Sequence, residues 1–245
     1  MKSKILISPV MILIISTMFL FNCQAKEKDL WQGNITSNSI IKQERKVSSF
    51  DKLKIGSALD IVLSQGDKEM VVVEAPENII EKIITEVRGS ELVIRVQQHT
   101  KNLNNVKITI FFKDLEAMNI SGAVDVENEG TMKFQKLEMS ISGASNVDFK
   151  MNVDKLALII SGASDLTLIG TAESAKIEVS GASETKGLDF IIQDAMVEAS
   201  GASEVSINAK ESLAVEISGA STVTYKEGPP VFKSHVTGGG SLRKI

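Results

Sequence analysis

Residues 156–168 read "LALIISGASDLTL", and the tetrapeptide "SGAS" at their centre occurs five times, starting at 142, 161, 180, 200 and 218. "SGAV" at 121 and "TGGGS" at 237 extend the series, and successive starts are separated by 21, 19, 19, 20, 18 and 19 residues. A fixed period of this length is typical of a solenoid coil and is too short for tetratricopeptide or ankyrin repeats. The repetition therefore predicts a protein built from stacked, similar coils.

Apolar residues occupy every second position on both sides of each tetrapeptide. Around the second SGAS, Leu156, Leu158 and Ile160 come before it, and residues 166 and 168 are leucines. A period of two indicates a β-strand with one buried face. Continuing this alternation through the motif places its glycine and its last serine toward the interior. We therefore expect the strand to bend at each motif, where the interior is too narrow for a Cβ atom.

The segments between these units are short and polar, such as "GTAES" at 170–174 and "NAKES" at 208–212. No helical pattern of 10 to 15 residues intervenes, which argues against alternating strands and helices. The sequence predicts an all-β fold, a parallel β-helix of about 19–20 residues per coil with SGA(S) corners and strands about 4.8 Å apart. A β-sandwich is the alternative, although hairpins do not require one sequence at one phase six times.

The first half of the chain resembles a known family. Longer strands are expected within 52–63, 70–75, 90–96 and 106–112, with a short helix within 75–87. "FDKLKIGSALDIVLSQG" at 50–66 and "EVRGSELVIRV" at 86–96 resemble the opening blocks of the family called putative auto-transporter adhesin, head GIN domain, and the SGA repeats resemble its later coils. The resemblance covers about residues 47 to 240. It implies a right-handed β-helix in an exported or lipid-anchored protein, with no catalytic residues to carry over.

The N-terminus has the features of an export signal. Lys2 and Lys4 precede a mostly apolar run at 5–21, which ends next to Cys23, the only cysteine of the chain. We expect a lipoprotein signal peptide at 1–22, lipidation of Cys23, a polar tether at 23–46 and a single β-helix domain at 47–245. This predicts an exported, membrane-anchored lipoprotein at the outer membrane, on its periplasmic side or at the cell surface. An uncleaved anchor and a plain secretory signal are the alternatives.

The charge balance limits the class of partner. Without residues 1–22 the chain has 25 basic and 31 acidic side chains, a net charge of −6. Nucleic acid is therefore not expected as a partner, because no basic patch is available to neutralise phosphates. The expected partners are a membrane, through the lipid anchor, and a protein or glycan that the sequence does not identify. Self-association is left open.

The outward positions of the motifs form a predicted recognition strip of small residues between two acidic columns. The strip consists of Ser142, Ala144, Ser161, Ala163, Ser180, Ala182, Ser200, Ala202, Ser218 and Ala220. The flanking acids are Glu178, Glu198 and Glu216 on one side and Asp165, Glu184 and Glu204 on the other. Stacked carboxylates repel unless water or a cation screens them, so calcium is conceivable. No dedicated calcium repeat is present, and we expect no cofactor and no metal site. A solvated turn without a ligand is the simpler interpretation of the strip.

An enzyme is the main alternative function. Exported β-helices include polysaccharide lyases and hydrolases, which need clustered carboxylates. Asp60 and Asp125 are the best acidic candidates, although each also suits a turn. The two histidines, His99 and His235, lie in a polar loop and near the C-terminus, and no zinc or phosphate-binding motif is present. We predict a non-catalytic, adhesin-like envelope protein; an envelope polysaccharide-active enzyme and a self-associating structural scaffold are the alternatives.

Overall fold

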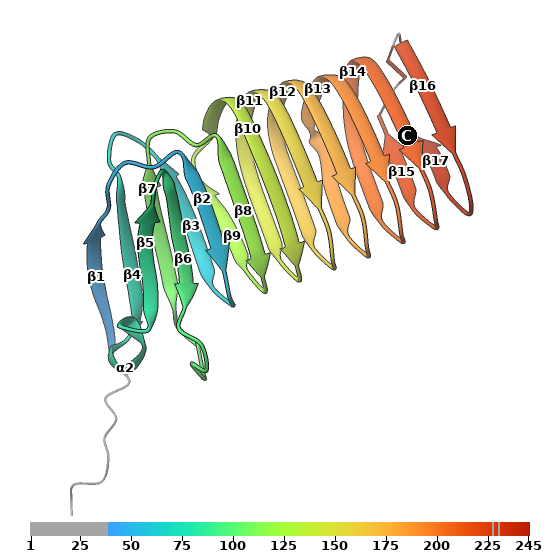
Figure 1. Ribbon diagram of the computed structural model, residues 1–245. Coiled ribbons are helices and arrows are strands. Elements are labelled where there is room, and N and C mark those ends of the chain that lie inside the picture. Colours follow the sequence, from blue (N-terminus) through green and yellow to red (C-terminus); the bar gives the residue numbers. More distant parts are fainter. Residues whose placement is uncertain (1–38, 227, 230) are drawn as a thin grey trace, which may run out of the picture. The chain divides into compact units, whose positions relative to one another are not determined.

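All of the strands in the described part of the chain belong to one hydrogen-bonded sheet that winds back over itself (Figure 1). The computed structural model describes residues 39–226, 228, 229 and 231–245. The predicted signal peptide, Cys23 and the tether up to residue 38 therefore lie outside the described residues. The predicted all-β solenoid is confirmed, and the β-sandwich alternative is wrong.

The described residues form seventeen strands and one short helix. They are β1 (Ile40–Lys46), β2 (Lys52–Gly56), β3 (Asp60–Gln65), β4 (Met70–Pro76), α2 (Glu77–Ile80), β5 (Ile83–Arg88), β6 (Glu91–Val96), β7 (Lys107–Phe112), β8 (Ala117–Gly122), β9 (Asp125–Glu129), β10 (Met132–Gly143), β11 (Asn146–Ile160), β12 (Asp165–Val179), β13 (Glu184–Ala199), β14 (Glu204–Ile217), β15 (Thr222–Tyr225), β16 (Val231–Val236) and β17 (Ser241–Lys244).

Each of the later coils has two faces joined by an SGAS corner. In β11, residues 155–160 lead into a corner and pair with the equivalent part of β12, whereas residues 146–153 leave the previous corner and pair with the start of β12. We call these the pre-corner face and the post-corner face. The pairing is parallel throughout, and residue i of β11 lies beside residue i+19 of β12. The sequence period is therefore the length of one coil.

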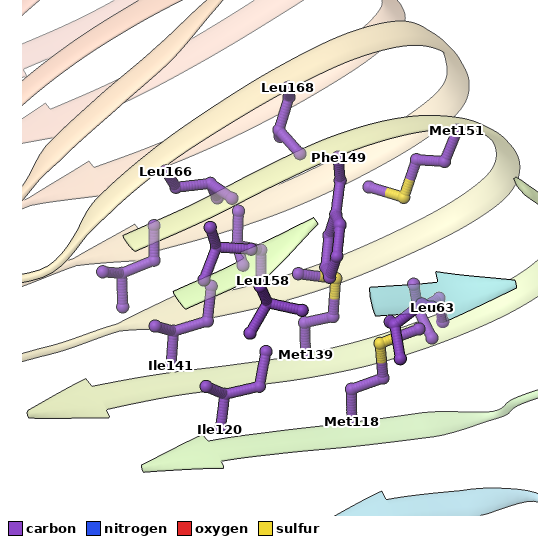
Figure 2. Packing of buried hydrophobic residues seen from close by; sticks show 14 of the residues in the cluster. Leu63, Met118, Ile120, Met139, Ile141, Phe149, Met151, Leu158, Leu166 and Leu168 are labelled. Carbon is purple, nitrogen blue, oxygen red and sulfur yellow. The ribbon is translucent and has the colours of Figure 1, made fainter. Parts of the chain in front are cut away.

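The core lies between the two faces and is filled by the alternating apolar residues (Figure 2). Ile120, Ile141 and Ile160 stack from coil to coil at exposures of 1, 0 and 0%. Phe149 extends from the post-corner face toward the pre-corner face and is 1% exposed. Burying one such side chain contributes about 1.5–3 kcal/mol to stability. The repeated sequence therefore builds one continuous core.

The corner glycines adopt a left-handed backbone. Gly162 has φ +90°, and a Cβ built on it would lie 2.4 Å from the carbonyl oxygen of Gly143 in the preceding coil. The predicted need for glycine is therefore correct, but the predicted inward direction is wrong, because Gly162 and Ala163 are both exposed. The left-handed residue interrupts the strand alternation. The crowding is along the solenoid axis, between coils, and not across the interior.

The last serine of each motif does point inward, as predicted. Ser145, Ser164, Ser183, Ser203 and Ser221 are at most 3% exposed. The Ser164 hydroxyl lies 3.4 Å from the carbonyl oxygen of Gly143 and 3.5 Å from that of Ser161, and it accepts a hydrogen bond from the Ser145 N–H at 3.4 Å. These contacts satisfy a polar side chain in the core and connect consecutive corners.

The N-terminal end of the solenoid is covered by strands that do not follow the coil order. The coil formed by β6 and β7 stacks outside the earlier coil formed by β2 and β3, because β2 pairs with both β6 and β8 and β3 with both β7 and β9. Antiparallel β5 covers β6, and antiparallel β4 and β1 cover β7. The Arg45 side chain of β1 donates hydrogen bonds to the carbonyl oxygens of Ile80 and Ile83, which joins β1 to the segment around α2.

Two expectations for this region need correction. Residues 40–46, which the sequence places in the polar tether, form β1, because their backbone pairs with β4 while most of the side chains stay exposed, as is usual for an edge strand. The expected helix within 75–87 is limited to Glu77–Ile80, and residues 83–88 form β5. The β-branched residues of that segment and the left-handed Gly89 favour a hairpin with β6.

Replacing Gly162 by alanine tests the corner. The Cβ would meet backbone in a conformation that L-residues rarely adopt, so we expect a loss of at least about 2 kcal/mol, or roughly 5 °C in Tm. Ala163→Ser, at the neighbouring exposed position, should change stability by less than about 0.5 kcal/mol. Thermal unfolding followed by circular dichroism measures both. Equal stability of the two variants would show that the stacked glycines do not set the coil spacing.

Candidate binding surface

The predicted recognition strip lies along one edge of the solenoid, where the two faces meet. Its five alanines are exposed in every coil, whereas the serines at 142, 161, 180 and 200 are half-buried and Ser218 is exposed. The Ser180 hydroxyl donates a hydrogen bond to the carbonyl oxygen of Ile160 at 3.3 Å. Serine in this column therefore helps to close the corner, and the alanine methyl groups form the outermost part of the strip.

The glutamates of the pre-corner face line a groove beside the strip. Glu178, Glu198 and Glu216 are in register on β12, β13 and β14. Together with the neighbouring serines they surround a groove of about 300 Å³, which we call the glutamate groove. Its lining is Ile159, Glu178, Val179, Ser180, Glu198, Ala199, Ser200, Glu216, Ile217, Ser218, His235 and Thr237. The structure thus joins three serines of the strip and one predicted acidic column in a single concave surface.

His235 and Ile159 extend the groove beyond the three glutamates. His235 lies one coil after Glu216 and pairs with it. Ile159, which is 49% exposed, lies one coil before Glu178 and pairs with it. The sequence contained a signal for the histidine, because His235 stands two residues before Thr237 just as Glu216 stands two residues before Ser218. The weak match of "TGGGS" to the motif hides this equivalence.

A lysine reduces the repulsion that the sequence predicts between stacked glutamates. The Nζ atom of Lys176 lies 2.6 Å from Oε1 of Glu178 and 3.4 Å from Oε1 of Glu198. The hydrogen bond to Glu178 is the main cause that raises the pKa of Lys176, followed by the charge of Glu178 and then by Glu198. Glu216 has no ion pair with a described residue and keeps an uncompensated charge in the groove.

The second acidic column lies on the post-corner face, across the strip. Asp165, Glu184 and Glu204 are in register, and Lys186 forms an ion pair with Glu184 at 3.0 Å, which raises the pKa of Lys186. The two columns therefore border the strip on opposite faces, as the sequence predicts.

The two aspartates considered for catalysis also lie in this second column. Asp60 pairs with Asp125, and both line a groove of about 300 Å³ together with Lys107, Glu127 and Asp148. Neither aspartate side chain forms a hydrogen bond or ion pair with another described residue, so the turn-supporting role is not observed. His99 has a left-handed backbone in the loop between β6 and β7 and does not line this groove. Among residues 39–226, 228, 229 and 231–245, no three histidine, aspartate or glutamate side chains are placed to hold a metal ion.

The chain is similar to known proteins in sequence and in fold. The family described as "Putative auto-transporter adhesin, head GIN domain" matches residues 49–229. A putative adhesin from Bacteroides fragilis has a similar structure, with a TM-score of 0.81 and 24% identity over 86% of this chain and 99% of that one. A putative lipid binding protein from Parabacteroides distasonis gives a TM-score of 0.69 and 25% identity over 84% and 97% of the two chains. A putative adhesin from the same species gives a TM-score of 0.68 and 16% identity, over 86% of this chain and 98% of that one. No curated protein is significantly similar to the chain.

Replacing Lys176 by glutamine tests the electrostatics of the glutamate groove. Without the lysine, Glu178 and Glu198 repel, so we expect a lower Tm at pH 7 in 20 mM salt and a smaller difference from wild type in 1 M NaCl. Because the pKa of Lys176 is raised in the folded state, its stabilisation is present at neutral pH and is lost as the pH rises through that raised pKa, above 10.5. Thermal unfolding at both salt concentrations measures the effect. A Tm difference that does not depend on salt would contradict it.

Proposed function

Since this chain belongs to the head GIN domain family of putative auto-transporter adhesins, we propose that it is a non-catalytic protein of the cell envelope that binds a macromolecule through the recognition strip and the glutamate groove. The observation that carries the proposal is the register of the coils, which turns one exposed alanine per repeat and the glutamates of three consecutive repeats into a continuous surface. A long surface of this kind suits an extended partner better than a small molecule.

The chemistry of the surface favours a protein partner over a glycan. The carboxylates of the groove suit lysine or arginine side chains of a protein partner. Glycans are commonly bound by stacking on aromatic rings, whereas Phe232 is the only aromatic residue among the strongly exposed large hydrophobic residues of the described part. Phe232 does not line the glutamate groove.

Two other functions have weaker support. One relative is named as a lipid binding protein, but the groove described above is lined by glutamates and serines, which suit cations better than acyl chains. The relatives named above carry the names of adhesins or of a lipid binding protein, and none carries the name of an enzyme. A polysaccharide-active enzyme would use the groove at Asp60 and Asp125, and it would lose glycan cleavage on Asp60→Asn substitution.

The proposal includes a lipid anchor at Cys23 after a signal peptide at 1–22, with a membrane as the first partner. The lone cysteine at the end of the apolar run supports it. Among the described residues, no helix is sufficiently long and apolar to cross a bilayer. The tether would place the solenoid at the outer membrane, on the periplasmic side or at the cell surface.

A double substitution tests the recognition strip. Ala163→Arg together with Ala182→Arg adds two long side chains at exposed positions, so the protein should fold while binding falls at least about tenfold. The assay is a binding screen of the chain against matrix proteins and glycan arrays, with and without calcium. Thr171→Arg together with Gln193→Arg, which adds the same charge at exposed positions outside the glutamate groove, is the matched control. Equal binding by both double variants would exclude the strip as the contact surface.

A cysteine substitution tests the anchor. In cells fed a labelled fatty acid, the wild-type chain should incorporate label and sediment with membranes, whereas Cys23→Ala should incorporate none, because it lacks the thiol that would be acylated. Fractionation followed by immunoblotting measures both. Label on the alanine variant would show that the acyl chain is attached elsewhere.

A further inference from the structure

The C-terminal end of the solenoid presents two unpaired strand edges. β16 pairs only with β14, and β17 pairs only with β15, so no described strand covers their outer sides. At the N-terminal end β1 and β5 also keep one unpaired edge each, but the core is covered there, and Ile79 and Ile80 of α2 are only 5 and 2% exposed. The two ends of the described unit are therefore chemically different.

The core is open at this C-terminal end. Phe232 is in register with Leu213 and Val236 with Ile217, which are 1 and 2% exposed in their own coil. In the last coil the exposed fractions of Phe232 and Val236 rise to 40 and 42%. The Phe232 ring stacks on Tyr225 at 5.4 Å between centroids, so it is held in its core position although no described strand covers it. This is the arrangement of a core that continues into another layer.

We propose that the C-terminal end binds the same end of a second copy of this chain, forming a closed dimer around a two-fold axis perpendicular to the two faces. In this dimer β16 would pair antiparallel with β16 of the second copy, and β17 with β17. A peptide strand could cover only one of the two edges. The second copy presents both edges and the apolar gap between them at the same separation, about 10 Å.

The sequence of β16 suits antiparallel pairing with itself. With Ser234 at the two-fold axis, Phe232 of one copy lies opposite Val236 of the other, and all three side chains point into the joined cores. Such a contact is self-complementary, so it closes at two copies. A head-to-tail filament is disfavoured because the core is covered at the opposite end of the solenoid.

The contact would be small. The end measures roughly 20 Å along the strands and roughly 20 Å across both faces, so each copy would bury on the order of 500 Å². This lies below the size of a standard stable interface, and we expect reversible dimers at micromolar concentrations. Lys233, Arg243 and Lys244 of the two copies repel each other, so dimerisation should strengthen as salt is added.

Sedimentation equilibrium of the compact unit Ser39–Ile245, which contains every core residue of the described part, tests the dimer. Wild type should show a monomer–dimer equilibrium that shifts toward dimer between 0.05 and 0.5 M NaCl. Phe232→Glu should raise the dimer dissociation constant at least tenfold. Met196→Glu, at a residue that is 39% exposed on the outer side of β13, is the matched control and should leave it unchanged. A monomer at every concentration, assemblies larger than dimers, or equal effects of both substitutions would overturn the proposal.

A crosslinking experiment tests the dimer without depending on whether Phe232→Glu folds. Residues 39–245 contain no cysteine, so Ser234→Cys introduces a single thiol. Directly opposed strand residues lie about 4.5–5.5 Å apart between Cα atoms, within the range of a disulfide. We expect Ser234→Cys to form covalent dimers under mild oxidation, and Ala163→Cys, on the recognition strip, to form few. Equal crosslinking by both variants would count against the dimer.

Discussion

The close approach of one corner to the next holds this solenoid together. The glycine carbonyl of each corner accepts a hydrogen bond from the alanine N–H one coil later, as in the 2.8 Å bond from Ala163 to Gly143. At that separation, a Cβ on the glycine of the next coil would lie 2.3 to 2.6 Å from the same oxygen in the five SGAS corners. The corner backbone thus keeps these bonds from coil to coil at a sharp turn, and only glycine fits there. Core side chains then pack at the spacing that this bond sets.

Register is what converts a repeated sequence into a surface. The coils are not all the same length, and the pairing of β12 with β13 and of β13 with β14 contains register shifts. These shifts lie between Thr167 and Ile169 and near Gly187 and Ile192, away from the corner. The strip and the glutamate groove therefore remain regular although the repeats vary in length.

The two ends of the solenoid differ in how the core is covered. At the N-terminal end, a hairpin, a short helix and a polar edge strand cover the core, and the Arg45 side chain fixes β1 to them. At the C-terminal end, the core-facing side chains of the last coil remain exposed. The two ends of the solenoid therefore present different surfaces.

The sequence by itself determined the period, the strand alternation, the need for glycine at each corner and the two acidic columns. Each of these follows from a pattern within one repeat, and stacking the repeats at a nearly constant length brings equivalent residues side by side. Only the tertiary structure decided three other features. The β6–β7 coil stacks outside β2–β3, β1 is a strand although its side chains are polar, and Lys176 lies between two glutamates. Each depends on contacts between segments far apart in the chain or on the rotamer of a long side chain. The glycine direction also required the structure, because a left-handed residue breaks the alternation from which the sequence is read.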